Sequence, residues 1–234
     1  AATAQLLSID AETVARVLAR AVEGERVVTD VLSDIKVIYL PQLYSAETYC
    51  TARLKELSAA SFPTEQNLDV RIHTAAEESG LSYSQQQEQA IREAASCGLL
   101  LITGGPGTGK TTVLRGILNL LRSLKLNCLA APTGRAAKRL SEVTGEEAST
   151  IHRLLESGID PATGKMVFAR DDSNPLKCDA VVVDEMSMVD VLLMSSLLKA
   201  IPKGKRLILV GDPDQLPPVG PGFPFSDMLR SGCL

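Results

Sequence analysis

The nine residues from Gly104 to Thr112, GGPGTGKTT, restrict the fold of this chain more than any other stretch. They follow an apolar run, Leu99–Thr103, and precede a helical pattern that begins at Val113. The stretch satisfies G-x-x-x-x-G-K-[S/T]. In that motif the glycines let backbone N–H groups surround phosphate oxygens, and the following helix adds its positive dipole end. Lys110 is expected to reach the β- and γ-phosphates of a nucleotide, and the Thr111 hydroxyl to bind magnesium. A merely glycine-rich turn would need neither side chain.

Strand and helix patterns alternate from residue 81 onward. Apolar residues three or four positions apart predict helices over 113–124 and 189–198. Four continuous apolar runs have strand length, as expected in a parallel sheet that is covered on both faces. These runs are Leu99–Thr103, Cys128–Ala131, Ala180–Val183 and Leu207–Val210. The predicted fold class is α/β, with a ligand site beyond the carboxyl ends of the strands.

Length and pattern together predict two domains. The 234 residues, 45% of them hydrophobic, suffice for one main core and a small accessory module. A helix over Ala11–Glu23, a short strand over Val37–Leu40 and a helix over about 45–57 resemble a small winged-helix module, although other small folds fit equally well. The predicted division is a winged-helix-like module at 1–60, a linker with a short helix at 61–80 and the main domain at 81–234.

Composition and charge narrow the class of protein. The net charge is −4, yet residues 94–141 contain seven bases and no acid, which makes them a candidate anion-binding segment. No apolar run approaches the roughly 20 residues that span a bilayer, and the first thirty residues lack a signal-peptide pattern. We therefore expect an intracellular protein that is not secreted and has no membrane partner. The five cysteines are widely scattered in the sequence and are expected to be small core residues.

Two acids, Asp184 and Glu185, follow the apolar run Ala180–Val183, where a buried strand should leave the sheet. Asp184 is placed to hold magnesium through water, and Glu185 to orient and deprotonate an attacking water. An isolated pair of acids is usually a solvated strand end, but the phosphate loop upstream favours the hydrolytic role. The second acid favours a motor-type ATPase over a small switch GTPase, and no NKxD guanine motif occurs.

The last apolar run leads into VGDPDQLPPVG, which places Gln215 in a loop rich in proline. Because neighbouring parallel strands deliver their ends to one edge of the sheet, Gln215 should come near the γ-phosphate. Its neutral amide can respond to the presence of that phosphate. Pro213, Pro217 and Pro218 restrict the backbone, so we expect a small shift at Gln215 to move the loop as a rigid piece.

Gln87 precedes the phosphate loop and has two interpretations. Ser84 and Gln87 have the spacing of a capping box, which alone would explain both residues. A glutamine before a phosphate-binding strand can also present one donor and one acceptor to the edge of an adenine. The residues themselves leave both interpretations open.

Two further segments are candidates for binding a nucleic acid strand. After the second apolar run, Thr133 and the N–H groups at a helix start could hold a phosphate, with Arg135 nearby. A second helix start combines the Thr150 hydroxyl, the His152 imidazole and the Arg153 guanidinium. His152 taken alone is more simply a core or capping histidine, since its apolar neighbours need no ligand to explain them.

The motifs in order resemble the first motor domain of superfamily 1 DNA helicases, closest to the RecD-like 5′-to-3′ branch. The residues that carry the resemblance are Ser84 and Gln87, then GGPGTGKTT, APTGRAAKRL, STIHRLL, VVVDEMSMVD and VGDPDQLPPVGPG, within about 81–232. The resemblance implies a RecA-like P-loop NTPase fold with ATP and Mg²⁺ at Gln87, Gly105, Pro106, Gly107, Thr108, Gly109, Lys110, Thr111, Thr112, Asp184, Glu185 and Gln215. It also implies single-stranded DNA near Pro132, Thr133, Arg135, Thr150 and His152.

The resemblance further implies an ATP-dependent DNA helicase of repair or recombination, in a bacterial-type cytoplasm or a DNA-containing organelle. Other subunits of a helicase–nuclease complex would be partners. The second motor domain of such helicases is expected to be missing, because the sequence ends soon after the sixth motif. Two alternatives stay open: a nucleotide-responsive DNA-binding module with little turnover of its own, and a superfamily 1 RNA helicase. Residues 157–175 lie where these helicases carry a strand-separating hairpin, but are too short and polar to be assigned as one.

Overall fold

The computed structural model describes residues 2–32, 34–63, 67–78, 80, 82–121 and 127–232. The chain divides into two compact units, Ala1–Tyr49 and Cys50–Leu234, and the division falls inside helix α3, Pro41–Ala59. The boundary therefore differs from the predicted one near residue 60. The physical reason is that the second half of α3 belongs to the larger unit: Leu54 and Leu57 are buried there, and Arg53 Nη2 donates to the Ile201 carbonyl at 2.9 Å.

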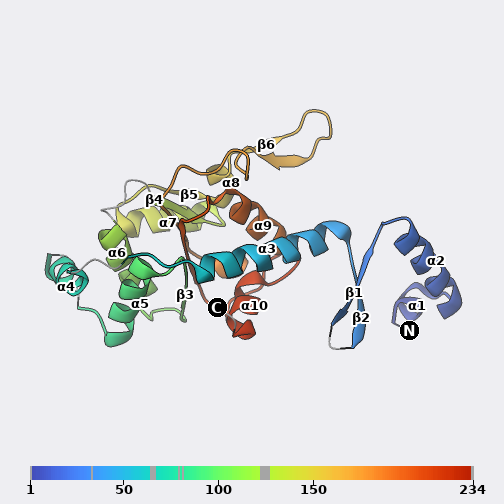
Figure 1. Cartoon of the computed structure of the whole chain (residues 1–234), viewed down its shortest axis with the longest axis horizontal. Helices are drawn as coiled ribbons and strands as arrows, with labels where there is room; N and C mark the ends of the chain where they lie inside the picture. The colour runs from blue at the N-terminus through green and yellow to red at the C-terminus, as the bar shows by residue number, and fades with distance from the viewer. Residues whose placement is uncertain are drawn as a thin grey trace. The chain divides into compact units, whose positions relative to one another are not determined.

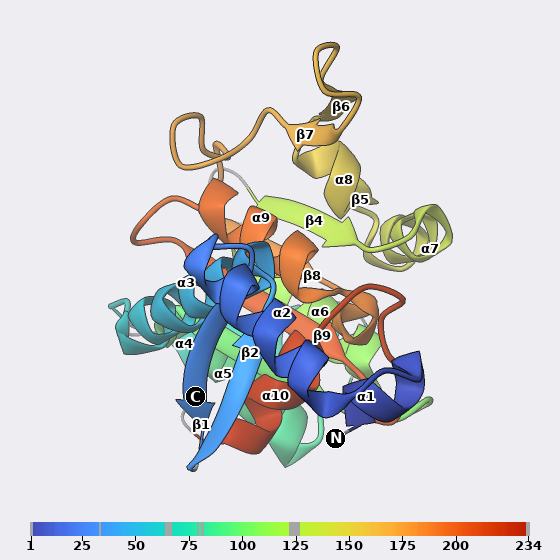
Figure 2. The same ribbon diagram turned by 90° about the vertical axis from the view of Figure 1, so that its right-hand side faces the viewer.

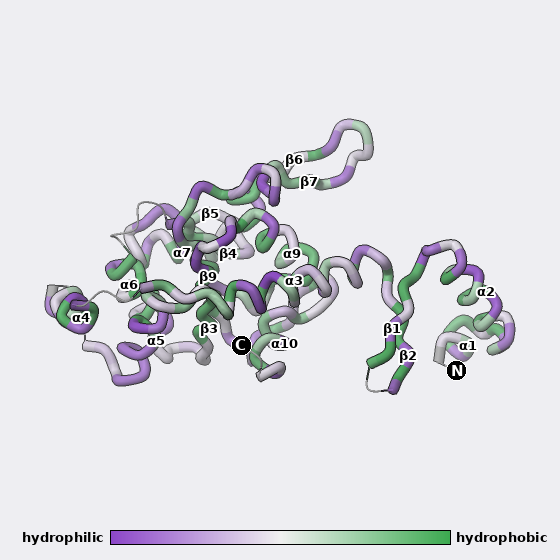
Figure 3. Tube along the Cα trace, in the orientation of Figure 1, coloured by the Kyte–Doolittle hydropathy of each residue, from purple (hydrophilic) through white to green (hydrophobic). Residues whose placement is uncertain are grey.

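The smaller unit consists of two helices, a hairpin and the first half of α3. Helices α1, Ala2–Leu7, and α2, Ala11–Glu23, precede the antiparallel strands β1, Val28–Leu32, and β2, Ile35–Tyr39. The helix predicted over 11–23 is confirmed, and Asp10 caps it by accepting from the Thr13 N–H at 2.7 Å. Many apolar side chains of this unit are exposed. Some of them lie on β1 and β2, which are partly green, that is hydrophobic, in Figure 3. The winged-helix-like character of the module remains a prediction.

The larger unit contains a five-stranded parallel sheet in the order β3-β9-β8-β4-β5 (Figures 1 and 2). Its strands are β3, Leu99–Thr103; β4, Asn127–Ala131; β5, Ala148–Thr150; β8, Ala180–Val183; and β9, Arg206–Gly211. The four strands predicted from apolar runs are all present, and the α/β fold class is confirmed. In β8 every side chain is fully buried, including Val181 and Val182, which point to opposite faces. Both faces of the sheet are therefore covered.

Helices and a small hairpin connect the strands. The helices are α4, Leu68–Glu78; α5, Gln85–Ser96; α6, Lys110–Leu121; α7, Gly134–Thr144; α8, Ile151–Leu154; the 3₁₀ turn η1, Met186–Met188; α9, Val191–Ala200; and α10, Pro224–Ser231. The hairpin of β6, Ser157–Ile159, and β7, Met166–Phe168, projects from α8 away from the sheet in both views (Figures 1 and 2). None of the described helices is long and apolar enough to cross a membrane.

The segment predicted as a linker, 61–80, packs closely where it is described. Leu68 and Ile72 of α4 lie in the same buried cluster as α5, α6 and the sheet. Before α4, the Phe62 N–H donates to the Ser96 carbonyl at 2.8 Å, and the Arg206 guanidinium lies 3.7 Å from the centre of the Phe62 ring. These contacts attach the segment to α5 and β9.

Candidate functional site

Three neighbouring strands bring the predicted nucleotide residues to one edge of the sheet. The loop Gly104–Gly109 follows β3, the loop that contains Gln215 follows β9, and Asp184 and Glu185 follow β8. Because β9 pairs with both β3 and β8 and all three are parallel, their carboxyl ends lie side by side. The loop with Gln215 therefore starts between the phosphate loop and the two acids.

The phosphate loop has the backbone that its glycines permit. Gly107 and Gly109 have φ of 77° and 85°, a left-handed region that side chains rarely adopt. Lys110, at the start of α6, donates from Nζ to the Gly104 carbonyl and, at 2.9 Å, to the Gly105 carbonyl. Thr108 Oγ1 also donates to the Gly105 carbonyl, at 2.9 Å. These two carbonyls hold the lysine ammonium against the loop. Pro106 and Thr111 are exposed and Thr112 is half-buried.

Gln87 completes the capping box and also lies beside the phosphate loop, while its contact with an adenine stays a prediction. Its Oε1 accepts from the Ser84 N–H at 2.9 Å while the Ser84 hydroxyl accepts from the Gln87 N–H at 3.3 Å, so the capping box is complete. The amide nitrogen of the same side chain lies against Gly109, where an added Cβ would clash with it. The capping hydrogen bond therefore holds the Gln87 side chain beside the phosphate loop.

Asp184 and Glu185 differ in environment. Burial raises the pKa of Asp184 above its ordinary value, although the Glu185 N–H, which donates to Asp184 Oδ1 at 2.9 Å, and the charges of Lys110 and Arg139 act to lower that pKa. Glu185 has φ 54° and ψ 39°, the left-handed conformation that costs a residue other than glycine free energy and is concentrated at functional sites. The turn thus places a half-buried carboxylate, that of Asp184, next to a residue with a strained backbone, Glu185.

The oxygen atoms available at this edge of the sheet show whether the site fits a magnesium ion. Within the described residues no group of three or more His, Cys, Asp or Glu side chains could hold a metal ion. Mg²⁺ bound together with a nucleotide needs only one or two protein oxygens, since phosphates and waters complete its shell. The Thr111 hydroxyl and the Asp184 carboxylate supply such oxygens, and a cation beside Asp184 would offset the cost of its burial. The residues fit a magnesium ion that arrives with phosphate.

Asp184→Asn is expected to stabilise the fold. A raised pKa means that the ionised carboxylate costs stability above that pKa, and that this cost fades as pH falls toward the ordinary value of 3.8. The amide removes the charge while keeping the size of the side chain, so the melting temperature at pH 7 should rise. In a domain of this size each 1 kcal/mol gained corresponds to roughly 2–4 °C. Calorimetry at pH 7 and pH 4 measures it, and the gain should shrink at the lower pH.

Asp179→Asn is the matched control. It lies just before the same strand, and its carboxylate pairs with Lys205 Nζ at 2.9 Å, so its loss should lower or leave unchanged the melting temperature. If Asp184→Asn melted below the wild type at pH 7, the desolvation argument would be wrong.

The loop that contains Gln215 is built on Asp212. This aspartate is only 3% exposed, and its carbonyl accepts from the Gln215 N–H at 3.2 Å while its Oδ1 accepts from the Asp214 N–H at 3.0 Å. Gln215 itself is exposed. A cavity of about 270 Å³ lies beside the loop, lined by Pro213, Gln215 and Pro217 together with Ser187, Phe223 and Arg230.

The predicted nucleic-acid residues lie at or just after the ends of the two remaining strands. Pro132, Thr133 and Arg135 come after β4. Thr150 is the last residue of β5 and His152 follows it, at the far side of the sheet from β3. Both threonines are N-caps: Thr133 Oγ1 accepts from the Ala136 N–H at 3.2 Å, and Thr150 Oγ1 from the Arg153 N–H at 3.1 Å. A capping hydroxyl keeps its own proton for a further acceptor such as a phosphate.

The His152 ring packs against Phe168 at the base of the β6–β7 hairpin, with 5.8 Å between ring centres. This contact supports the simpler interpretation of His152 as a structural residue.

Sequence reasoning missed three residues that the fold brings to this site. Arg139 of α7 acts electrostatically on Asp184, Ser187 bonds to Asp212, and Asp212 is the buried base of the Gln215 loop. Arg139 belongs to the acid-free segment, which marked it as a candidate for binding an anion. Its interaction with Asp184 could not be predicted, because the two residues are far apart in the chain. A serine two residues after the second acid carried no signal of its own.

A strand, a glycine loop with Lys110 and a helix, together with a half-buried acid at the end of a nearby parallel strand, define a P-loop nucleotide-binding domain. The chain belongs to the AAA domain family, which matches residues 87–221. It is 40% identical over 189 residues to the ATP-dependent RecD2 DNA helicase of Deinococcus radiodurans, covering 80% of this chain and 25% of that protein. It is 41% identical over 170 residues to the RecBCD enzyme subunit RecD of Mycolicibacterium smegmatis, covering 62% of this chain and 30% of that protein. The predicted resemblance to RecD-like superfamily 1 helicases is confirmed.

The chain spans about a quarter of the length of the RecD2 helicase and under a third of the RecD subunit. Among solved structures it is similar to the Pif1 helicase from Candida albicans, with a TM-score of 0.45 and 26% identity over 62% of this chain and 36% of that one.

Proposed function

We propose that this chain is the ATP-binding motor domain of a RecD-like DNA helicase, which couples ATP hydrolysis to 5′-to-3′ movement on single-stranded DNA. One observation carries the proposal: the phosphate loop, the two acids and the Gln215 loop follow three adjacent parallel strands and share one edge of the sheet. That arrangement allows a single nucleotide to meet a phosphate-binding loop, a hydrolytic acid and a γ-phosphate sensor at once.

The proposed roles follow from the chemistry of each group. Gly105 to Thr112 would hold the phosphates with backbone N–H groups, and Lys110 would exchange its loop carbonyls for phosphate oxygens. Gln87 would bind the adenine. Thr111 and Asp184 would hold Mg²⁺, which when bound neutralises phosphate charge. Glu185 would accept a proton from the attacking water.

Single-stranded DNA is the proposed polymer partner. Thr133 and Thr150 lie at helix N-termini on adjacent strands, where backbone N–H groups and capping hydroxyls suit the phosphates of one strand. Pro132, Arg135 and His152 border these two positions. Because relatives include subunits of the RecBCD enzyme, partner subunits of a helicase–nuclease complex are also part of the proposal.

A competition assay tests the polymer. A labelled DNA oligonucleotide at low salt should be displaced by unlabelled single-stranded DNA at lower concentration than by RNA of the same sequence, and its affinity should fall steeply as salt rises. Phosphate release from ATP by the same preparation should rise when DNA is added. Stronger competition and stimulation by RNA would replace DNA with RNA as the partner, and absence of nucleotide binding would refute the motor assignment.

A further inference from the structure

Ser187 makes two hydrogen bonds to one residue of the neighbouring strand end. Its hydroxyl donates to the Asp212 carbonyl at 2.6 Å and accepts from the Asp212 N–H at 2.8 Å. The space around it is tight, because a Cβ on Gly211 would lie 2.9 Å from Ser187 Oγ and 2.7 Å from the Phe225 ring. One hydroxyl therefore satisfies both backbone groups of a residue that is 3% exposed.

On one side, Ser187 closely follows Asp184 and Glu185 in the chain. Glu185 is the residue from which η1 begins, and Met186, fully buried, separates it from Ser187. Ser187 thus lies in the single 3₁₀ turn that follows Glu185, the residue strained at φ 54°, so a change in the Glu185 backbone has a short route to it.

On the other side, Asp212 is hydrogen-bonded to the Gln215 loop. The Asp212 carbonyl that receives the Ser187 hydroxyl also receives the Gln215 N–H, at 3.2 Å. A chain of two hydrogen bonds thus joins Ser187 to Gln215.

The far end of the loop is held by the same segment that contains Ser187. The Val191 N–H donates to the Pro221 carbonyl at 2.9 Å, and Gly220 lies so close to the Asp190 carboxylate that no side chain would fit. Between the two anchors Leu216 and Val219 are exposed, and the 270 Å³ cavity lies beside the loop. The ends of the loop are therefore fixed to residues 187–191 while its middle has room to move.

From this geometry we infer that Ser187 is a positioning residue that couples the Asp184–Glu185 turn to the Gln215 loop. It holds the two parts of the γ-phosphate end of the site in one arrangement, so that the loop follows the state of the acids. The inference rests on the proposed ATP-binding function and adds to it a route by which hydrolysis moves the loop.

Hydrogen exchange on this chain tests the coupling. Saturating ATPγS with magnesium should slow exchange of the Asp214 and Gln215 amides by about tenfold in the wild type, roughly the effect of one net hydrogen bond. Ser187→Ala should bind ATPγS with unchanged affinity in calorimetry yet lose most of this nucleotide-dependent protection. Ser187→Cys, whose thiol is a weak donor and acceptor, should retain an intermediate part and serves if the alanine variant does not fold. Ser196→Ala is the control, since Ser196 Oγ donates to the Leu192 carbonyl at 2.9 Å within α9.

A double-mutant cycle separates coupling from mere stability. If Ser187 acts through Gln215, Ser187→Ala should add little to the loss of DNA-stimulated phosphate release caused by Gln215→Ala. Additive losses of phosphate release in the double variant would overturn the inference. So would full protection of the loop amides in Ser187→Ala. Neither result would contradict the proposed ATP binding. Failure of the wild-type chain to bind ATPγS would instead remove the proposed function and the coupling with it. A lower melting temperature with normal protection would show that Ser187 only stabilises the turn.

Discussion

Glu185→Gln is expected to bind ATP normally and to lose nearly all hydrolysis. The amide preserves the size of the side chain and the Glu185 N–H that donates to Asp184 Oδ1, so the turn should keep its shape. It cannot accept a proton from the attacking water, and a positioned base contributes about 10²–10⁴ in rate. We therefore expect phosphate release to fall by a factor in that range with ATPγS affinity unchanged, the behaviour of a group that acts in the transition state.

Phosphate release and calorimetry on one preparation measure this result. Glu142→Gln is the matched control, because Glu142 on α7 is 65% exposed and forms only a long pair with Lys138, 3.8 Å apart. Exposed pairs of this kind contribute little. Hydrolysis that survived Glu185→Gln within a few-fold of the wild type would show that another group accepts the proton.

Lys110→Ala is expected to remove most of the affinity for ATP. Hydrogen bonds to a charged group contribute about 1.5–3 kcal/mol each, so the loss of one phosphate contact should weaken binding by roughly 10- to 150-fold. The chain should stay folded, because Lys110 is only half-buried and contacts loop carbonyls, not the core. A small fall in melting temperature is expected from the lost bonds to Gly104 and Gly105.

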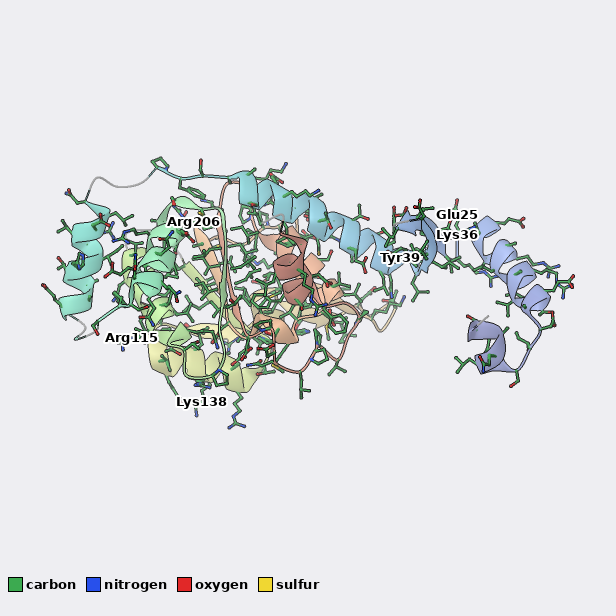
Figure 4. All side chains as sticks on the ribbon, turned by 90° about the horizontal axis from the view of Figure 1, so that it is seen from below. Glu25, Lys36, Tyr39, Arg115, Lys138 and Arg206 are labelled. Carbon is green, nitrogen blue, oxygen red and sulfur yellow. The ribbon has the colours of Figure 1, made fainter. Side chains whose placement is uncertain are left out.

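Lys138→Ala provides the comparison for this variant. The Lys138 side chain is 80% exposed and projects from the surface of α7 in Figure 4, so its removal changes the net charge by the same amount without touching the phosphate loop. Equal affinities of the two variants for ATPγS would mean that Lys110 acts only through the overall charge, and would refute its role at the phosphates.

Local sequence was sufficient for much of the site. The glycines of the phosphate loop, the capping box of Ser84 and Gln87 and the acids after β8 were predicted because each depends on residues close together in the chain. The apolar runs also predicted the four strands that carry these groups. Their order in the sheet was not predicted, since the pairing of β9 between β3 and β8 depends on contacts between residues about 25 or more than 100 positions apart.

The sequence by itself determined which chemical groups this protein places at the ends of its strands: a phosphate loop, two acids, a glutamine and two helix-capping threonines. These follow from periodicity and spacing, which act over one or two turns of chain. The tertiary structure alone decided that α4 joins the core, that the charge of Arg139 acts on Asp184, and that Ser187 bonds to Asp212. It also brought together the thiols of Cys128 and Cys178, whose contact, with burial, raises the pKa of Cys178. Each of these contacts joins residues that are distant in the chain, so its free energy depends on how whole elements pack, and no local pattern records it.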